Sequence, residues 1–148
     1  MTRKSTDTPE SLLCFEIYAA NLAFGRLLKP YLDAMGVTYP QFLVLDALWA
    51  QDGISVGDLG LRLALDSSTL SPILKRLETN RLVTRRRDSR DERRVTVTLT
   101  DLGRALQEPA SHMTCKAANS TGLDAAALSD LRRSLVRLRA HLSEAAAG

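Results

Sequence analysis

The sequence of 148 residues predicts a mainly α-helical fold with one small β-hairpin, which is an α+β class. Apolar residues recur at helical spacing through most of the chain, with breaks at glycine, proline and capping residues. Residues 82–87 and 95–99 instead have the composition of strands, and a charged loop separates them. These observations place several helices before the hairpin and further helices after it.

The first predicted helix begins at Pro9, with Thr8 as its cap, and ends at Gly36. Between residues 11 and 32 its apolar side chains occupy more than one face, whereas a surface helix shows a single stripe. Other parts of the fold must therefore cover this helix on several sides, and a second subunit is one candidate for that cover.

Three shorter helices are predicted next, each preceded by a residue whose side chain can cap it. Ser55 with Asp58 resembles a capping box. The last of the three carries apolar residues at i, i+3, i+4 and i+7, so one of its faces is expected to be buried. Their expected bounds are 41–50 after Thr38 and Pro40, 56–65 after Ser55, and about 68–80 after Asp66 and Ser67.

After the hairpin, a helix begins at Thr100 and is interrupted near Pro109, and Asp124 caps a final helix that runs to about residue 144. The leucines of this final helix follow the alternating three- and four-residue spacing of a coiled-coil seam. The seam packs either against its own chain or against a second subunit, and the apolar first helix favours a homodimer. The seam consists of Leu128, Leu131, Leu135, Leu138 and Leu142.

The net charge of +3 is unevenly distributed along the chain. Nine basic and four acidic residues lie between Lys75 and Arg94, a local net charge of +5, whereas the rest of the chain sums to −2. A basic band on a near-neutral body is typical of a protein that binds the phosphate backbone of nucleic acid. A solvated charged face would look the same, so the neighbouring elements have to decide between the two.

Three short helices followed by a two-stranded hairpin is the element order of a winged helix-turn-helix. The helix at 68–80 presents small hydroxyl residues near its N-terminus, which lets its backbone approach the floor of a major groove in double-stranded DNA. Basic residues one turn further on are placed for phosphates, and a proline near the first turn costs least there. The residues expected to contact DNA from this helix are Ser67, Ser68, Thr69, Ser71, Pro72, Lys75 and Arg76.

The hairpin tip, or wing, has the length and charge to enter an adjacent minor groove, where a narrowed groove favours arginine. Asp91 is an acid in this loop, and we expect it to orient Arg93 or Arg94 through a charge-assisted hydrogen bond. A flexible, solvated hairpin is the alternative. The wing residues expected at the DNA are Arg87, Arg90, Asp91, Arg93 and Arg94.

These elements predict one domain over residues 1–148. Its DNA-binding lobe would cover about 38–100, and its dimerisation helices about 9–35 and 101–146. A dimer would set two reading helices about one helical turn of DNA apart, or a multiple of it, on a palindromic operator.

Composition excludes several other classes of protein. No apolar run reaches the roughly 18 residues of a membrane helix, and the polar N-terminus is no signal peptide, so we expect a cytoplasmic protein without a membrane partner. Two cysteines do not make a disulfide scaffold. His112 and Cys115 lie three residues apart, but further soft ligands are scattered, so we expect neither a metal nor a cofactor.

Several segments together resemble the MarR family of transcriptional regulators. They are residues 65–78 (LDSSTLSPILKRLE), 82–85 (LVTR), 91–93 (DER), Leu99, Thr100 and Gly103. Residues 13–18 (LCFEIY) and 38–45 (TYPQFLVL) are similar to the organic-hydroperoxide-sensing, OhrR-like branch of that family. The resemblance covers nearly the whole chain.

This resemblance implies a homodimeric repressor of a peroxide-detoxification gene, with an organic hydroperoxide as its effector. By the motif, Cys14 would be oxidised to sulfenic acid, after which the dimer releases DNA. Tyr18 and Tyr39 would line the sensing pocket. The family's Tyr-Lys-Pro segment is Leu-Lys-Pro at 28–30 here, so Tyr31 is the candidate replacement for a missing tyrosine. Cys115 would close an intersubunit disulfide with Cys14, as in two-cysteine members of the branch.

The residues around Cys14 leave its role open when they are taken without the resemblance. The predicted helix start puts Cys14 in the second turn, with Tyr18 four residues on and on the same face. A phenol that donates to the sulfur would favour the reactive thiolate. Apolar neighbours suit a lipophilic peroxide but also suit an inert, buried cysteine. A buried and unpaired Cys115 is likewise an alternative to a disulfide partner.

Three other functions remain as alternatives. A MarR-type regulator released by a phenolic or aromatic ligand would have a merely structural Cys14. An enzyme such as a thiol peroxidase lacks support, because there is no Cys-x-x-Cys, nucleophile motif or phosphate loop. An architectural DNA binder would ignore both peroxide and ligands.

Overall fold

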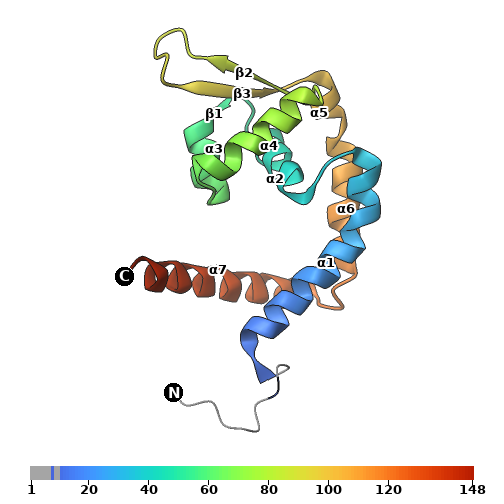
Figure 1. Ribbon diagram of the computed structural model, residues 1–148. Helices are drawn as coiled ribbons and strands as arrows, with labels where there is room; N and C mark the ends of the chain where they lie inside the picture. The colour runs from blue at the N-terminus through green and yellow to red at the C-terminus, as the bar shows by residue number, and fades with distance from the viewer. Residues whose placement is uncertain (1–7, 9–10) are drawn as a thin grey trace. The chain divides into compact units, whose positions relative to one another are not determined.

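The structure, a computed structural model, describes residue 8 and residues 11–148. The chain divides into two compact units, one up to Met113 and one from Thr114 to Gly148. Figure 1 follows the elements in chain order. They are α1 (Leu13–Met35), α2 (Tyr39–Ala50), β1 (Ile54–Ser55), α3 (Val56–Leu63), α4 (Ser67–Thr79), β2 (Val83–Arg87), β3 (Val95–Leu99), α5 (Asp101–Ala105), α6 (Gln107–Asn119) and α7 (Ala125–Ala147).

The predicted hairpin is confirmed, but it belongs to a three-stranded antiparallel sheet in the order β1-β3-β2. β2 pairs with β3 from Val83 opposite Leu99 to Arg87 opposite Val95. The added strand, β1, has only two residues, and Ile54 pairs with Val97. A strand of two residues carries no alternation, so sequence reading had no period to detect.

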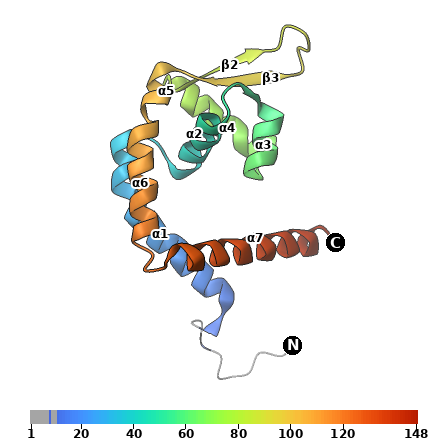
Figure 2. The same cartoon turned by 180° about the vertical axis from the view of Figure 1, so that it is seen from behind.

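The core of the first unit gathers on α2, α3, α4 and the sheet, and Figure 2 shows these elements from behind. Leu45, Leu48, Leu59 and Leu74 are almost completely buried there. Asp52 joins the end of β3 to α5. Its carboxylate accepts from the Leu99 N–H of β3 and from the Arg104 guanidinium of α5, each at 2.9 Å. The three short helices and the wing therefore form one packed body.

The cap of α1 differs from the prediction. Its N-cap is Leu12, without a side-chain cap, so a start at Pro9 capped by Thr8 is wrong. The Thr8 carbonyl instead accepts from the N–H and the hydroxyl of Ser11, which closes a separate turn. Pro9 itself lies outside the described residues. The predicted end is confirmed, since Gly36 adopts the left-handed conformation at φ 68°.

The caps predicted for α2, α3 and α4 are all present. Thr38 and Gln41 form a reciprocal capping box, and the Ser55 and Asp66 side chains each accept a backbone N–H of their helix. α3 ends at Leu63 rather than at residue 65, because Ala64 turns into the left-handed region at φ 54°.

The helices after the sheet follow the prediction with one refinement. The break falls at Leu106, which ends α5, while Pro109 lies in the first turn of α6, where its missing N–H is tolerated. Asp124 caps α7 as expected. Within residues 11–148, no helix combines the length and the apolar character that crossing a membrane requires.

Candidate nucleic-acid interface and thiol sites

The N-terminus of α4 presents the hydroxyl residues that the sequence assigned to DNA. Ser67, Ser68, Thr69 and Ser71 are all exposed. The Asp66 carboxylate accepts from the Ser68 hydroxyl and from the Thr69 N–H, each at 2.8 Å. The hydrogen bond from Ser68 is the main cause that lowers the pKa of Asp66, and the hydrogen bonds from Thr69 lower it further. The Ser68 proton is thus committed to the cap, which leaves its oxygen lone pairs for an outside donor.

The opposite side of α4 is apolar and holds the helix in place. Leu70, Leu74 and Leu77 are buried, as predicted, while Lys75 and Arg76 are exposed one turn beyond the hydroxyl residues. Pro72 is exposed in the second turn of the helix. All seven expected α4 residues are therefore exposed along the polar side of this helix, opposite its buried leucines.

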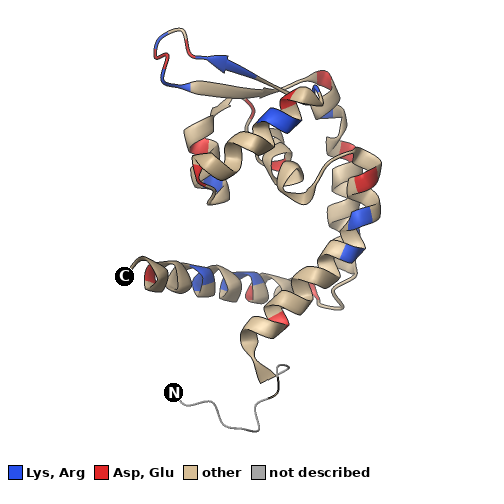
Figure 3. Cartoon of the chain, viewed as in Figure 1, with Lys and Arg blue, Asp and Glu red and all other residues tan. Residues whose placement is uncertain are grey.

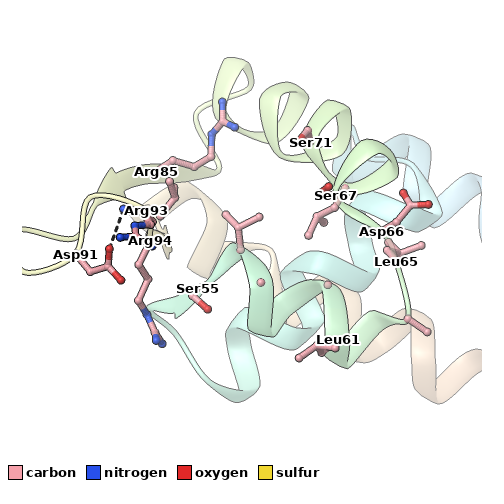
Figure 4. A pocket seen from close by; sticks show the side chains of 16 residues that line it. Ser55, Leu61, Leu65, Asp66, Ser67, Ser71, Arg85, Asp91, Arg93 and Arg94 are labelled. Carbon is pink, nitrogen blue, oxygen red and sulfur yellow. Dashed lines mark hydrogen bonds between the residues drawn. The ribbon is translucent and has the colours of Figure 1, made fainter.

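A concave surface of about 800 Å³ lies between α3, the start of α4 and the wing. Figure 4 shows Ser67 and Ser71 on one wall and Arg93 and Arg94 on the other. The structure thus brings the two groups of predicted DNA contacts to opposite walls of one hollow.

The wing is fixed to the end of α4 by a half-buried ion pair that sequence reading missed. The Glu78 carboxylate accepts from Nε of Arg85 at 3.0 Å and from its Nη2 at 2.8 Å. The hydrogen bond from Arg85 lowers the pKa of Glu78. Arg85, a member of the basic band, is therefore occupied inside the protein. Glu78 lies on a helix and Arg85 on the strand that follows it. Neither the helical nor the strand period therefore predicts that the two side chains meet.

The loop of the wing is shaped by short acidic side chains that accept backbone N–H groups. Asp88 accepts from the Arg90 N–H at 2.8 Å, and Asp91 accepts from the Arg93 N–H at 3.1 Å. Figure 4 shows the second bond as a dashed line. The expectation that Asp91 binds a guanidinium is therefore corrected. An aspartate commonly bonds the backbone two residues on, which is closer than the end of an arginine side chain.

Basic residues follow one another along β2 and recur in the loop that it enters, where Figure 3 colours the ribbon blue. Arg87 donates to the Glu92 carbonyl at 3.4 Å. The Arg94 guanidinium lies 3.1 Å from the Asp58 carboxylate of α3. Arg90 and Arg93 are exposed. The wing therefore combines exposed basic side chains with hydrogen bonds and an ion pair that shape its loop.

Both cysteines are free and exposed in the chain. Because α1 begins at Leu13, Cys14 lies in the first turn of the helix and not in the second. Cys115 lies in α6, within the second unit, where its sulfur accepts from the Asn119 amide at 3.6 Å. Neither thiol is therefore buried within the single chain.

The three tyrosines expected in a sensing pocket do not share one cavity of this chain. A cavity of about 590 Å³ between α1 and α2 is lined by Leu22, Phe24 and Tyr39 among others. Tyr18 is 60% exposed and Tyr31 is half-buried, and neither lines that cavity. In the part of the chain that the structure describes, no three His, Cys, Asp or Glu side chains are grouped to hold a metal ion.

Known proteins with similar sequences are transcriptional regulators. A family model for the transcriptional regulators SarA/Rot matches residues 26–108. The HTH-type transcriptional regulator TtmR of Methylorubrum extorquens (strain PA1) is 51% identical over 110 residues, 72% of this chain and 56% of that protein. The organic hydroperoxide resistance transcriptional regulator of Bacillus subtilis (strain 168) is 45% identical over 101 residues, 68% of this chain and 69% of the relative. The match thus spans little more than half the length of TtmR.

Solved structures give the same result for the fold. Reduced AbfR bound to DNA superposes with a TM-score of 0.75 at 31% identity, covering 89% of this chain and 90% of the other. The disulfide form of AbfR superposes with a TM-score of 0.64 at 31% identity, covering 92% of this chain and 90% of the other. A MarR mutant from E. coli in complex with operator DNA gives 0.75 at 28% identity, covering 85% and 92%.

Fold, wing and reading helix define a winged-helix transcriptional regulator of the MarR type, which is a DNA-binding protein and not an enzyme. The chain belongs to the SarA/Rot family of transcriptional regulators. Its resemblance to the organic-hydroperoxide branch, predicted from residues 13–18 and 38–45, is confirmed by the relative at 45% identity.

Proposed function

We propose that this protein is a redox-sensing repressor whose homodimer leaves a palindromic operator when an organic hydroperoxide oxidises Cys14. One observation carries the proposal: the Cys14 thiol is exposed in the first turn of α1, in a chain similar to an organic hydroperoxide resistance regulator. A buried thiol would be closed to a peroxide, whereas an exposed one at a helix N-terminus has access and a favourable field for an anion.

The chemistry proceeds in two balanced steps. The Cys14 thiolate attacks one peroxide oxygen, the O–O bond breaks, and the second oxygen leaves as an alcohol after it takes up a proton. Cys14 is thereby oxidised to sulfenic acid. The thiolate of the partner subunit's Cys115 then attacks that sulfur and expels hydroxide, which leaves as water after protonation, so that an intersubunit disulfide forms. The disulfide protects Cys14 from further oxidation.

A homodimer is supported by apolar side chains that the single chain leaves uncovered. No residue of α7 is buried, and its seam leucines Leu131, Leu135 and Leu142 are exposed. On α1, Ile17 and Phe24 are exposed as well. Large exposed apolar stripes mark an interaction surface, and a second copy of the same chain would cover both helices.

DNA recognition is proposed for the surfaces that face each other across the hollow of Figure 4. The hydroxyl residues of α4 would contact base edges in the major groove, and Lys75 and Arg76 would contact phosphates. Arg90 and Arg93 would enter the minor groove, with Asp91 holding the loop backbone in shape.

The test measures binding of the purified protein to duplex DNA from its own promoter region, with and without cumene hydroperoxide. Wild-type protein should bind when reduced and release the duplex when oxidised. The Cys14→Ser variant should bind and stay bound. If Cys14→Ser is released by peroxide as readily as wild type, Cys14 is not the sensor.

The disulfide has its own test on a non-reducing gel. After peroxide treatment, wild-type protein should run as a covalent dimer that a thiol reductant reverses. The matched variant Cys115→Ser should oxidise and yet run as a monomer. A covalent dimer in Cys115→Ser protein would remove Cys115 from the mechanism while leaving Cys14 as the sensor.

A second candidate function is release by a phenolic ligand, with Cys14 merely structural. The observation in its favour is the cavity of about 590 Å³ that Phe24 and Tyr39 line. A simple phenol such as p-cresol distinguishes the two functions in the same binding assay. Release of wild type and Cys14→Ser by p-cresol, with no release by peroxide, would replace the redox proposal.

A further inference from the structure

The wing is tied to α3 by one exposed ion pair. Nη2 of Arg94 lies 3.1 Å from Oδ2 of Asp58, and the two side chains are 54% and 59% exposed. The same carboxylate oxygen accepts the Ser55 hydroxyl at 2.7 Å, and the Ser55 oxygen accepts the Asp58 N–H at 3.1 Å. Asp58 is therefore held in place by the cap of its own helix, and Arg94 reaches over to it.

This contact sets Arg94 apart from the other arginines of the loop. Arg90 and Arg93 bind the loop acids through their backbone N–H groups, and Arg87 donates to a carbonyl. Among the described ion pairs of residues 87–94, that of Arg94 with Asp58 is the one that neutralises a guanidinium. An acid thus restrains a wing cation at the wall of the hollow that is proposed to receive DNA.

We propose that Asp58 is a restraint on sequence-independent DNA binding: it holds Arg94 in the free protein, and a DNA phosphate must displace it. The inference rests on the proposed DNA surface, but not on peroxide sensing. Every duplex presents the same phosphates, so an arginine free to bind them adds affinity without adding discrimination. A carboxylate that competes for this arginine lowers that part of the affinity.

The exchange is energetically feasible because the existing pair is weak. It is a single, solvent-exposed contact, and exposed ion pairs contribute at most about 1 kcal/mol, a factor of about five in binding. An arginine–phosphate contact is stronger, and it releases counterions from the DNA. After the exchange, Asp58 keeps the Ser55 hydroxyl as its partner, so α3 retains its cap.

The test measures the affinity of reduced full-length protein for a fluorescent 30-base-pair duplex of random sequence over a range of salt concentrations. The variants are Asp58→Asn, Arg94→Gln and the double variant. Asparagine keeps an oxygen for the Ser55 hydroxyl and a backbone N–H for the cap, so the fold should persist, and a thermal unfolding curve verifies this. Asp33→Asn is the matched control, because it removes an exposed, ion-paired carboxylate on α1.

Asp58→Asn should tighten binding about two- to fivefold. The slope of log K against log salt should stay close to that of wild type, because Arg94 contacts the same phosphate in both complexes. Arg94→Gln should weaken binding and flatten that slope by about one. In the double variant the effect of Asp58→Asn should vanish, and Asp33→Asn should bind like wild type.

Four results would overturn the inference. If Asp58→Asn tightens binding equally with and without Arg94, the carboxylate acts only as a general negative charge. If Asp58→Asn weakens binding, Asp58 positions Arg94 for DNA and does not compete with it. If wild-type protein fails to bind the duplex at low salt, the proposed DNA surface fails too, whereas a protein that binds but ignores both substitutions refutes this inference alone.

Discussion

The segment from α2 to β3 and the helix α7 differ in where their apolar side chains go. All of the largest fully buried side chains except Met113 lie between residues 44 and 97. α7 carries a leucine seam of similar apolar character, yet it buries none of its residues. The first region is stabilised by its own contacts, whereas the leucine seam of α7 stays uncovered in the structure. From the proposed homodimer we expect substitutions in the α2–β3 segment to affect folding, and substitutions in the seam to affect assembly.

The largest expected effect follows from placing a charge in the α7 seam. Leu135→Arg removes about 2 kcal/mol of apolar burial from each of two subunits, which raises the dimer Kd by about a thousandfold. Analytical ultracentrifugation should show monomers at micromolar concentration, while the cooperative unfolding of the α2–β3 segment should persist. Ala140→Arg, on the exposed side away from the seam, is the control and should stay dimeric. A dimeric Leu135→Arg protein would mean that the seam packs within its own chain.

The next effect compares two leucines of the reading unit itself. Leu74 of α4 is completely buried, whereas Leu61 of α3 is 84% exposed. Leu74→Ala should lower the free energy of unfolding by about 2–5 kcal/mol, because it leaves a cavity under the recognition helix. Leu61→Ala should change it by less than about 0.5 kcal/mol. Urea unfolding of both variants measures the difference, and equal losses would contradict the burial that separates the two sites.

A smaller effect is expected from the ion pair that fixes the wing to α4. Glu78→Gln keeps the shape of the side chain but loses the charge that Arg85 binds, which should cost about 0.5 kcal/mol for a half-exposed pair. Because the pKa of Glu78 is lowered on folding, its contribution is present above the unfolded pKa of a glutamate and is lost as the pH falls through the folded value.

The pH dependence of stability tests the role of the Glu78 charge. Between about pH 7 and pH 3, the free energy of unfolding measured with urea should fall less for Glu78→Gln than for wild type. Asp33→Asn is the control, because it breaks an exposed ion pair with Lys29 on α1. Its free energy of unfolding should fall at low pH as much as that of wild type. An unchanged decline in Glu78→Gln would show that the Arg85 contact contributes no stability.

Sequence reading predicted the helix order, the capping residues Thr38, Ser55, Asp66 and Asp124, and the register of polar and apolar residues on α4, because each depends on contacts a few residues apart. It missed β1, the Glu78–Arg85 pair and the Asp58–Arg94 pair. These depend on which segments meet in three dimensions, and the two residues of the last pair are 36 apart. Candidate site residues could therefore be identified by type, but their partners could not.

An effect as small as that of Glu78→Gln is expected at the turn that joins α3 to α4. Ala64 adopts φ 54°, a left-handed conformation that a side chain makes unfavourable by about 1–2 kcal/mol. Glycine removes this cost but gains freedom in the unfolded chain, so Ala64→Gly should stabilise the protein by about 0.5 kcal/mol. Gly60, one turn earlier, is the opposite case, because a Cβ there would lie 2.8 Å from the Leu65 carbonyl oxygen. Thermal unfolding should therefore show a higher Tm for Ala64→Gly and a lower one for Gly60→Ala, and a lower Tm for both would place the strain of this turn elsewhere.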